Sequence, residues 1–307
     1  MVLLVLFGSA IVAGVLATLA TRRWPAVDPS RAPAVAAHEA ATHPAARRSF
    51  LRARIDPGTA TGLGLTLALL GIVVGGIVLG VLAFLVRGSD TGLIGVDSTA
   101  ARWGAVHSTS LSTFVLRAVT QLGATVTITV FVIALCVAEY RRLPSRSMPL
   151  YVLVVVIGQL LISNLIKIAV ARARPGIDPL AAFSGASFPS GHTTAAASFY
   201  AASALVLGRG RSFRVRTILT GVAVAIAVMV AASRVLLGVH WVSDVVAGLA
   251  LGWSWFAICS IAFGGRLMRF GAPVEAAQEV AKGGPGSTPP GSPASTSGYR
   301  PPQERSA

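Results

Sequence analysis

The sequence has 307 residues, of which 54% are hydrophobic and only 12% are charged, and its formal net charge is +15. Soluble globular domains carry about 25% charged residues, so this composition argues against a soluble protein. The positive charge alone could indicate nucleic-acid binding. However, the arginines are divided among segments that separate long apolar runs, and we therefore expect no nucleic-acid partner.

Seven apolar stretches follow one another along the chain, and a membrane-spanning helix needs about 20 such residues. We place them at Met1–Ala20, Gly62–Val86, Leu111–Ala138, Leu150–Val170, Thr193–Leu207, Thr217–Val230 and Val242–Phe263. The fifth and sixth are short and are expected to extend into their flanks. Alternating strand patterns are absent, which argues against a barrel. The predicted fold class is all-α: a polytopic membrane protein with a six-helix core and one extra N-terminal transmembrane helix.

The apolar stretches divide the chain into four parts. We expect a transmembrane anchor at 1–21, a cytoplasmic linker rich in Arg, Ala and Pro at 22–59, the six-helix membrane domain at 60–265, and a cytoplasmic tail at 266–307. The anchor lacks a basic start and its arginines follow the apolar run, so we expect a retained helix, not a cleaved signal peptide. The tail is rich in Gly, Pro, Ser and Thr and is expected to be disordered.

Small side chains inside the apolar stretches are assigned structural roles. Four glycines of the second stretch are expected to allow close helix packing, namely Gly71, Gly75, Gly76 and Gly80. Cys136 and Cys259 are expected to be small buried side chains, with neither a disulfide nor a metal site.

Arginines gather in alternate connections between the apolar stretches. They are Arg22, Arg23, Arg31, Arg47, Arg48, Arg52, Arg54, Arg141, Arg142, Arg146, Arg209, Arg211, Arg214, Arg216, Arg266 and Arg269. The positive-inside rule makes these connections cytoplasmic. We therefore expect a multi-pass plasma-membrane protein whose N-terminus is outside and whose C-terminus is cytoplasmic. Contact with anionic lipid headgroups is a secondary role for these arginines.

Three polar segments interrupt the apolar pattern, at 167–175, 189–192 and 233–244. They fall where the last four apolar stretches begin or end. Counting membrane crossings from the basic connections puts all three on the extracytoplasmic face. Ionisable groups at the membrane are costly and indicate a functional site. We expect the three segments to converge there.

Three cations in these segments suit the binding of a phosphate group: Lys167, Arg174 and Arg234. Arginine offers a planar fork for phosphate oxygens, and lysine offers a compact point charge. Pro175 prevents the helix from continuing after Arg174. Arg172 has no role in this pattern, and we expect it to snorkel to the membrane interface.

Pro189 to His192 is typical of a helix start. Ser190 is expected to cap the helix, and Gly191 lets backbone N–H groups approach an anion. Free N–H groups and the helix dipole favour phosphate at this position. Alone, this tetrapeptide is a weak signal, because any helix cap can produce it.

His240 and Asp244 are four residues apart, a spacing that puts them on one face of a helix. A carboxylate bonded to one imidazole nitrogen leaves the other free to attack phosphorus. A pair that only ties helices together is the alternative. His192 can protonate the leaving oxygen and then activate water. A metal bound by these three side chains is disfavoured, because the surrounding cations repel it. The remaining histidines are expected to be surface residues in loops: His38, His43 and His107.

At these residues the sequence resembles the type 2 phosphatidic acid phosphatase family, which shares its site with vanadium haloperoxidases and bacterial acid phosphatases. The family pattern Lys-x6-Arg-Pro matches Lys167 to Pro175, Pro-Ser-Gly-His matches Pro189 to His192, and Ser-Arg-x5-His-x3-Asp matches Ser233 to Asp244. The likeness covers roughly 60–265 and says nothing of the N-terminal stretch or the tail. It implies His240 as nucleophile, Asp244 as its partner and His192 as general acid, without a metal or other cofactor. The implied phosphate-binding residues are Lys167, Arg174, Ser190, Gly191 and Arg234.

We therefore predict a membrane lipid phosphatase that works through a phosphohistidine. The expected substrate is a lipid phosphate or diphosphate, such as undecaprenyl diphosphate, phosphatidic acid or phosphatidylglycerol phosphate. A lipid phosphotransferase with the same site, and a noncatalytic lipid-binding or transport protein, are the alternatives. A haloperoxidase fits less well, because those enzymes are soluble. The sequence carries no signal for oligomeric state.

Overall fold

Helices form every regular element in the part of the chain that the computed structural model describes, residues 1–23, 60–87, 93–144, 147–177 and 179–269. In chain order they are α1 (Val2–Arg23), α4 (Ala60–Leu85), α5 (Leu93–His107), α6 (Ser110–Thr120), η3 (Gln121–Gly123), α7 (Thr125–Arg142), α8 (Ser147–Val170), α9 (Gly191–Gly208), α10 (Phe213–Leu236) and α11 (Val242–Arg269). The linker predicted from Trp24 onward, the tail from Phe270 onward, and His38 and His43 lie outside the described residues.

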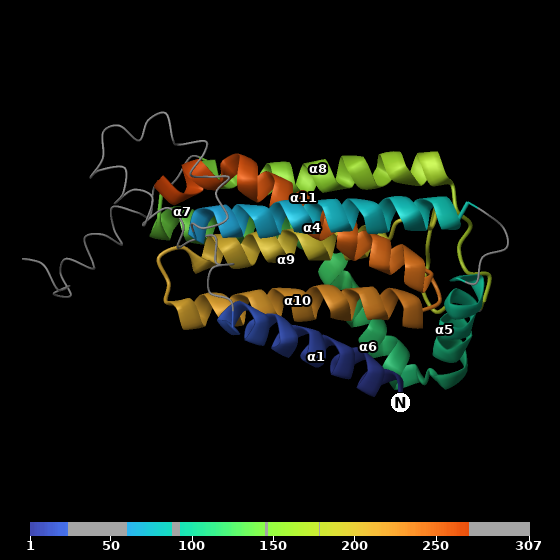
Figure 1. Cartoon of the computed structure of the whole chain (residues 1–307). Helices are drawn as coiled ribbons and strands as arrows, with labels where there is room; N and C mark the ends of the chain where they lie inside the picture. The colour runs from blue at the N-terminus through green and yellow to red at the C-terminus, as the bar shows by residue number, and fades with distance from the viewer. Residues whose placement is uncertain (24–59, 88–92, 145–146, 178, 270–307) are drawn as a thin grey trace, which may run out of the picture.

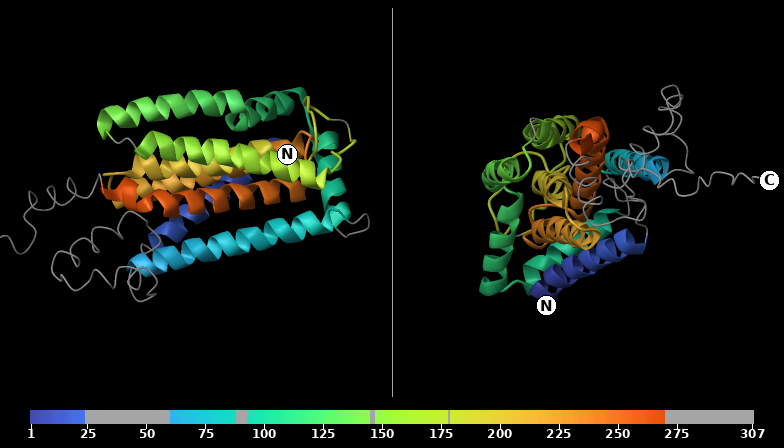
Figure 2. Two further views of the ribbon diagram at one scale, coloured as in Figure 1. Left: turned by 90° about the horizontal axis from the view of Figure 1, so that it is seen from above. Right: turned by 90° about the vertical axis from the view of Figure 1, so that its left-hand side faces the viewer.

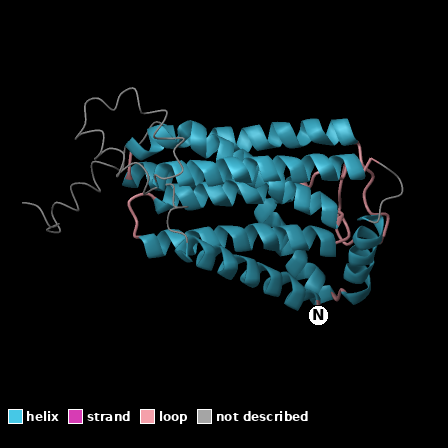
Figure 3. Cartoon of the chain, viewed as in Figure 1, coloured by secondary structure: helices cyan, strands magenta, loops and turns pink. Residues whose placement is uncertain are grey.

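The predicted all-α membrane fold is confirmed. Among the described residues, α1, α8, α10 and α11 are each long and apolar enough to cross a bilayer. All seven predicted stretches coincide with helices, and the longer helices run side by side along one axis of the bundle (Figure 1). The loops lie at the bundle ends, and several meet beside α5 (Figure 3).

Two predicted details are corrected by the structure. The stretch 111–138 is not one straight span, because α6 with η3 and α7 meet at an angle of 53°. The break falls at Ala124, whose backbone is extended. In addition, α5 was not among the predicted spans. It lies across one end of the bundle, where Gly104 meets the backbone of Leu236 at the end of α10 (Figure 1).

Helix α9 lies at the centre of the bundle, surrounded by α7, α8, α10 and α11 (Figure 2). Eleven of its 18 residues are buried, and most of these are Ala, Thr or Ser. Their small side chains let α11 approach closely, since a Cβ added to Gly252 would lie 2.7 Å from the carbonyl oxygen of Thr194. The helix that carries His192 is therefore held on several sides.

Only some of the glycines in the apolar helices lie in close contacts between helices. Of the four glycines singled out in α4, only Gly75 has a close neighbour, because a Cβ there would clash with Ser254 of α11. A Cβ added to Gly71, Gly76 or Gly80 would meet no atom of another described element within 4 Å, so the close-packing prediction is wrong for these three. The N-terminal helix α1 instead joins the core through Gly14, whose added Cβ would lie 2.8 Å from the carbonyl oxygen of Gly221 in α10.

An ion-pair cluster joins α7 to α9 at the end of the bundle where both helices finish. The buried Glu139 carboxylate accepts two bonds from Arg142 Nη1, at 2.7 and 2.9 Å. Arg209 Nη2 lies 3.6 Å from the same carboxylate. Because α9 begins at Gly191 and ends here, this cluster is at the opposite end of the bundle from the polar segments.

Candidate active site

Four helix ends bring the three polar segments together at one end of the bundle. Lys167 is in the last turn of α8, His192 in the first turn of α9, Arg234 in the last turn of α10 and Asp244 in the first turn of α11. Adjacent helices run in opposite directions, so the ends of α8 and α10 meet the starts of α9 and α11. The expected convergence of distant segments is present in the structure.

Backbone hydrogen bonds hold the connections at this end. The N–H of Leu180 donates to the Leu237 carbonyl oxygen at 2.9 Å, and the N–H of Ser190 donates to that of Asp244 at 3.0 Å. These bonds join the connection between α8 and α9 to the end of α10 and to the first turn of α11. The loop residues of the site therefore have fixed positions relative to the helix ends.

His240 and Asp244 are both buried, with exposed fractions of 1% and 0%. Nδ1 of His240 lies 3.3 Å from Oδ2 of Asp244. The pairing is as expected, but the two residues do not share a helix, because His240 is in the turn before α11 begins at Val242. The same carboxylate oxygen also accepts the Trp241 N–H at 2.9 Å and the Ser187 hydroxyl. The turn, and not helical spacing, brings the imidazole to the carboxylate.

The contacts of His240 define its tautomer. Nη1 of Arg174 lies 3.1 Å from Nε2. A guanidinium can only donate hydrogen bonds, so Nε2 must be the acceptor and carries a lone pair. Nδ1 then carries the hydrogen and donates it to Asp244. Burial, reinforced by the nearby arginines, lowers the pKa of His240 to about 4 despite the raising effect of Asp244. The imidazole is therefore neutral at pH 7, with its lone pair on Nε2.

Arg174 has a different environment from the one expected of a free phosphate ligand. Its Nε donates to the carbonyl oxygen of Gly185 at 2.9 Å, and Nη2 donates to that of Ser184 at 2.9 Å. Nη1 donates to the carbonyl oxygen of Val239 at 2.8 Å as well as to His240. Through these hydrogen bonds the guanidinium joins residues 184–186 to the turn that carries His240. Binding of a phosphate by Arg174 requires exchange of some of these bonds.

Arg234 and Lys167 have more donors available. The Arg234 side chain is buried, with 5% exposed, and donates from Nη1 to the Thr120 hydroxyl at 3.1 Å. Its buried Nε has no hydrogen-bond partner among the described residues. Lys167 Nζ lies 3.3 Å from the carbonyl oxygen of Ala186 and points toward Gly191, at the start of α9. These two cations are placed to hold an anion in front of that helix.

Helix α9 begins at the predicted position, but the hydrogen bonds of Ser190 at its start differ from the predicted ones. Ser190 is the N-cap residue, yet its hydroxyl accepts no backbone hydrogen bond and instead accepts one from the Thr193 hydroxyl at 3.0 Å. The predicted side-chain cap is therefore wrong. The first-turn N–H groups have no intrahelical partner, as at any helix start. His192 is half-buried in this turn, within electrostatic range of Lys167 and Arg234.

Arg172 was expected to snorkel, and this expectation is wrong. Its Nη1 donates to Oδ1 of Asp244 at 2.6 Å, and its Nη2 donates to Oδ2 of Asp97 at 2.8 Å. Asp97 was not among the predicted site residues, because α5 lies outside the apolar stretches, where an acidic residue is unremarkable in sequence. Ser187 and Ser243, whose hydroxyls bond to these carboxylates, were not predicted either.

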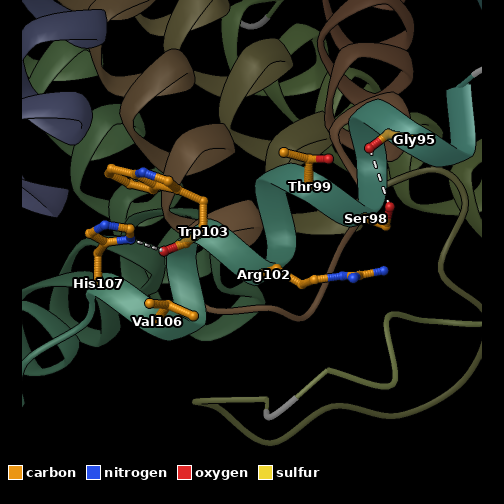
Figure 4. Close-up of a pocket in the computed structure, with 7 residues that line it drawn as sticks. All are labelled: Gly95, Ser98, Thr99, Arg102, Trp103, Val106 and His107. Atoms are coloured by element: carbon orange, nitrogen blue, oxygen red, sulfur yellow. Dashed lines mark hydrogen bonds between the residues drawn. The ribbon is translucent and has the colours of Figure 1, made fainter.

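The exposed face of α5 carries a separate shallow hollow of about 370 Å³. It is lined by Gly95, Ser98, Thr99, Arg102, Trp103, Val106 and His107 (Figure 4). His107 is exposed, as expected, but it is at the end of α5, where it stacks on Trp103 at a ring separation of 4.7 Å, so the expectation of a loop residue is wrong. The hollow contains none of the motif residues.

Comparison with known proteins indicates the same family that the motifs resemble, over residues 148–267. The model of the PAP2 superfamily matches residues 148–267, a range that contains all three polar segments. Lipid A 1-phosphatase of Rhizobium johnstonii is 41% identical over 118 residues, 35% of this chain and 44% of that protein. Phosphatidylglycerophosphatase B of Bacillus subtilis is 40% identical over 94 residues, 30% of this chain and 46% of that protein.

Two further relatives extend this comparison. Decaprenylphosphoryl-5-phosphoribose phosphatase of Mycobacterium tuberculosis is 39% identical over 109 residues, 34% of this chain and 55% of that protein. The crystal structure of a transmembrane PAP2 type phosphatidylglycerolphosphate phosphatase from Bacillus subtilis superposes with a TM-score of 0.59 at 27% identity, covering 65% of this chain and 98% of that one. The matched region spans about half the length of the curated relatives.

Proposed function

Because the chain belongs to the PAP2 superfamily of type 2 phosphatidic acid phosphatases over residues 148–267, we propose that it is a membrane lipid phosphatase. The observation that carries the proposal is the state of His240. Its Nδ1 is paired with a buried carboxylate, and its Nε2 lone pair faces the cations of the site. A neutral imidazole fixed in this tautomer is a nucleophile for phosphorus.

The first step forms a phosphohistidine. The substrate phosphate binds to Lys167, Arg174 and Arg234, together with the N–H groups at the start of α9. Its oxygens take over donors that Arg174 gives to its own loop and to Nε2 of His240, which frees the lone pair of Nε2. Nε2 of His240 then attacks phosphorus and the bond from phosphorus to the lipid oxygen breaks. His192, which enters this step as the imidazolium, gives its proton to that oxygen, so the lipid leaves as an alcohol, or as a lipid monophosphate when the substrate is a diphosphate.

The second step returns the enzyme to its starting state. His192, now neutral, takes a proton from water, and the water oxygen attacks phosphorus. The phosphorus–nitrogen bond breaks, inorganic phosphate is released and the lone pair returns to Nε2. Asp244 remains ionised and stabilises the positive charge that the imidazole gains in both steps. No metal or cofactor takes part in this scheme.

The substrate class follows from the site and from the relatives. Their names specify phosphatases of lipid A, of a glycerophospholipid and of a polyprenyl phosphoribose. These lipids share a phosphate group and little else, which supports a lipid phosphate or diphosphate as the class. Undecaprenyl diphosphate, phosphatidic acid and phosphatidylglycerol phosphate are the candidates. The sides of the bundle carry exposed apolar side chains, among them Leu165 and Ile168 near the end of α8. We therefore propose that the hydrocarbon chain enters between helices while the headgroup meets the cations.

The direct test is phosphate release from a panel of these lipids by purified protein in detergent, with His240→Ala as the blank. We expect release from at least one lipid and none from the variant. Release in ¹⁸O water should put one labelled oxygen into each phosphate, whereas a phosphotransferase needs an added acceptor alcohol. Vanadate should inhibit and EDTA should not. If no lipid phosphate is hydrolysed above the His240→Ala blank, the proposal is wrong.

A further inference from the structure

Arg172 joins two buried carboxylates that come from different helices. Its Nη1 donates to Oδ1 of Asp244 at 2.6 Å, and its Nη2 donates to Oδ2 of Asp97 at 2.8 Å. Asp97 and Asp244 have exposed fractions of 2% and 0%. The guanidinium also lies over the Trp241 ring, 5.4 Å from its centroid. An arginine placed in this way is part of the site and not a surface group.

Asp97 is itself held at the start of α11. Its Oδ1 accepts the backbone N–H of Ser243 at 3.0 Å, and its Oδ2 accepts the Ser243 hydroxyl at 2.6 Å. Helix α5 therefore contributes one carboxylate to the site, although it carries none of the motif residues. Two carboxylates and one guanidinium leave a net charge of −1 next to the imidazole of His240.

The two oxygens of Asp244 have separate partners. Oδ1 bonds to Arg172, whereas Oδ2 bonds to His240, to the Trp241 N–H and to the Ser187 hydroxyl. Arg172 thus fixes the rotation of the carboxylate and leaves one oxygen for the imidazole. Its positive charge, however, weakens the field that Asp244 exerts on His240, unless another group offsets it.

We propose that Asp97 and Arg172 are positioning residues for the nucleophile: Arg172 orients Asp244, and Asp97 neutralises Arg172 so that Asp244 keeps its full charge toward His240. The inference rests on the proposed phosphatase function. In the part of the chain that the structure describes, neither side chain hydrogen-bonds to Lys167, Arg174 or Arg234, so they act on His240 through Asp244. They matter most when the imidazole becomes positive on forming its bond to phosphorus.

The groups around His240 allow the pH dependence of this arrangement to be worked out. Among the described residues, the charged and titratable side chains that interact with His240 are Arg174 of the connection after α8, His192 of α9, Arg234 of α10 and Asp244 of α11. Behind them, Arg172 and Lys167 interact with Asp244, and Asp97 of α5 bonds to Arg172. Removing the charge of Asp97 leaves Arg172 uncompensated and disfavours a protonated His240. Removing the charge of Arg172 has the opposite effect.

The test compares Asp97→Asn and Arg172→Gln in a pH profile of kcat/KM. We expect the acid limb to move by about one pH unit in opposite directions, down in Asp97→Asn and up in Arg172→Gln. The expected fall in kcat is about tenfold for Asp97→Asn and larger for Arg172→Gln, which also loses the bond to Asp244. KM should stay within about twofold of the wild-type value, because the phosphate contacts remain.

Further variants separate charge from geometry. Arg172→Lys keeps the positive charge but loses the planar guanidinium that bonds to both carboxylates. Its acid limb should therefore lie at the wild-type position, while its kcat should lie between those of Arg172→Gln and the wild type. The double variant without both charges should also have its acid limb near the wild-type position. Glu139→Gln and Arg142→Gln are matched controls, because they break a similar buried ion pair at the opposite end of the bundle. Neither control should move the limb.

The outcomes distinguish this inference from the proposed function. A limb that moves in the same direction in both single variants, or a raised KM with unchanged kcat, would overturn the positioning role while the His240→Ala blank still defines the phosphatase. If the wild type releases no phosphate from any lipid, the proposed function fails. The inference is then tested without substrate, by ¹⁵N-histidine NMR titration of the purified protein. The His240 midpoint should shift as stated for the two variants, and unchanged midpoints refute the inference.

Discussion

Replacing Asp244 by Asn tests the tautomer of His240 most directly. The carboxylate accepts from Arg172 through one oxygen and from His240, Trp241 and Ser187 through the other. An amide has one oxygen and one NH₂, so one side of Asn must present a donor to a donor. A buried mismatch of this kind costs about 1–3 kcal/mol of stability.

The effect of Asp244→Asn on catalysis is larger. If the NH₂ group faces His240, it donates to Nδ1, and the imidazole proton moves to Nε2, where it faces the N–H of Arg174 and removes the nucleophilic lone pair. If the NH₂ group faces Arg172, the charge that stabilises the imidazolium is still absent. Loss of tautomer control at a comparable histidine–aspartate pair costs about 10⁴ in rate, and we expect a fall in kcat of this order.

The assay is initial-rate phosphate release at saturating lipid, with the thermal midpoint of each variant measured in the same detergent. Glu139→Gln is the control for replacing a buried, ion-paired carboxylate by an amide. We expect the control to retain wild-type kcat. A kcat for Asp244→Asn within tenfold of the wild type, in a protein that is folded, contradicts the assignment of Nε2 as the attacking atom.

Three further predictions concern pH, packing and sidedness. Burial lowers the pKa of His240 to about 4, and the neutral form is the nucleophile, so protonation of His240 should lower kcat/KM only below about pH 5; an acid limb at pH 6.5 would contradict this. An added Cβ at Gly123 would lie 2.6 Å from a carbonyl oxygen in the first turn of α9, so Gly123→Ala should destabilise the protein by about 1–3 kcal/mol and lower kcat, whereas Gly80→Ala, in open space, should do neither. In intact cells, an impermeant maleimide should label Arg102→Cys but label Arg214→Cys only after permeabilisation; the reverse pattern puts the site in the cytoplasm.

Local patterns in the sequence were sufficient for the helices and for the motif residues. An apolar run of about 20 residues is stable across a bilayer only as a helix, because its backbone groups must bond within the segment. The segments containing Lys167, His192 and His240 could be assigned to one face by counting crossings. The structure brings these segments together at one bundle end. Their catalytic roles remain proposals.

Only the tertiary structure decided what Arg172 does. From sequence it is an arginine at a helix end, and its partners are separated from it by 75 residues in one direction and 72 in the other. An arginine near a membrane either reaches water or pairs with a buried carboxylate, and the choice depends on where α5 and α11 place Asp97 and Asp244. The packing role of Gly75 was likewise settled by a neighbour distant in the chain, Ser254 of α11. Sequence spacing fixes contacts within a helix, whereas contacts between helices depend on how the whole bundle packs.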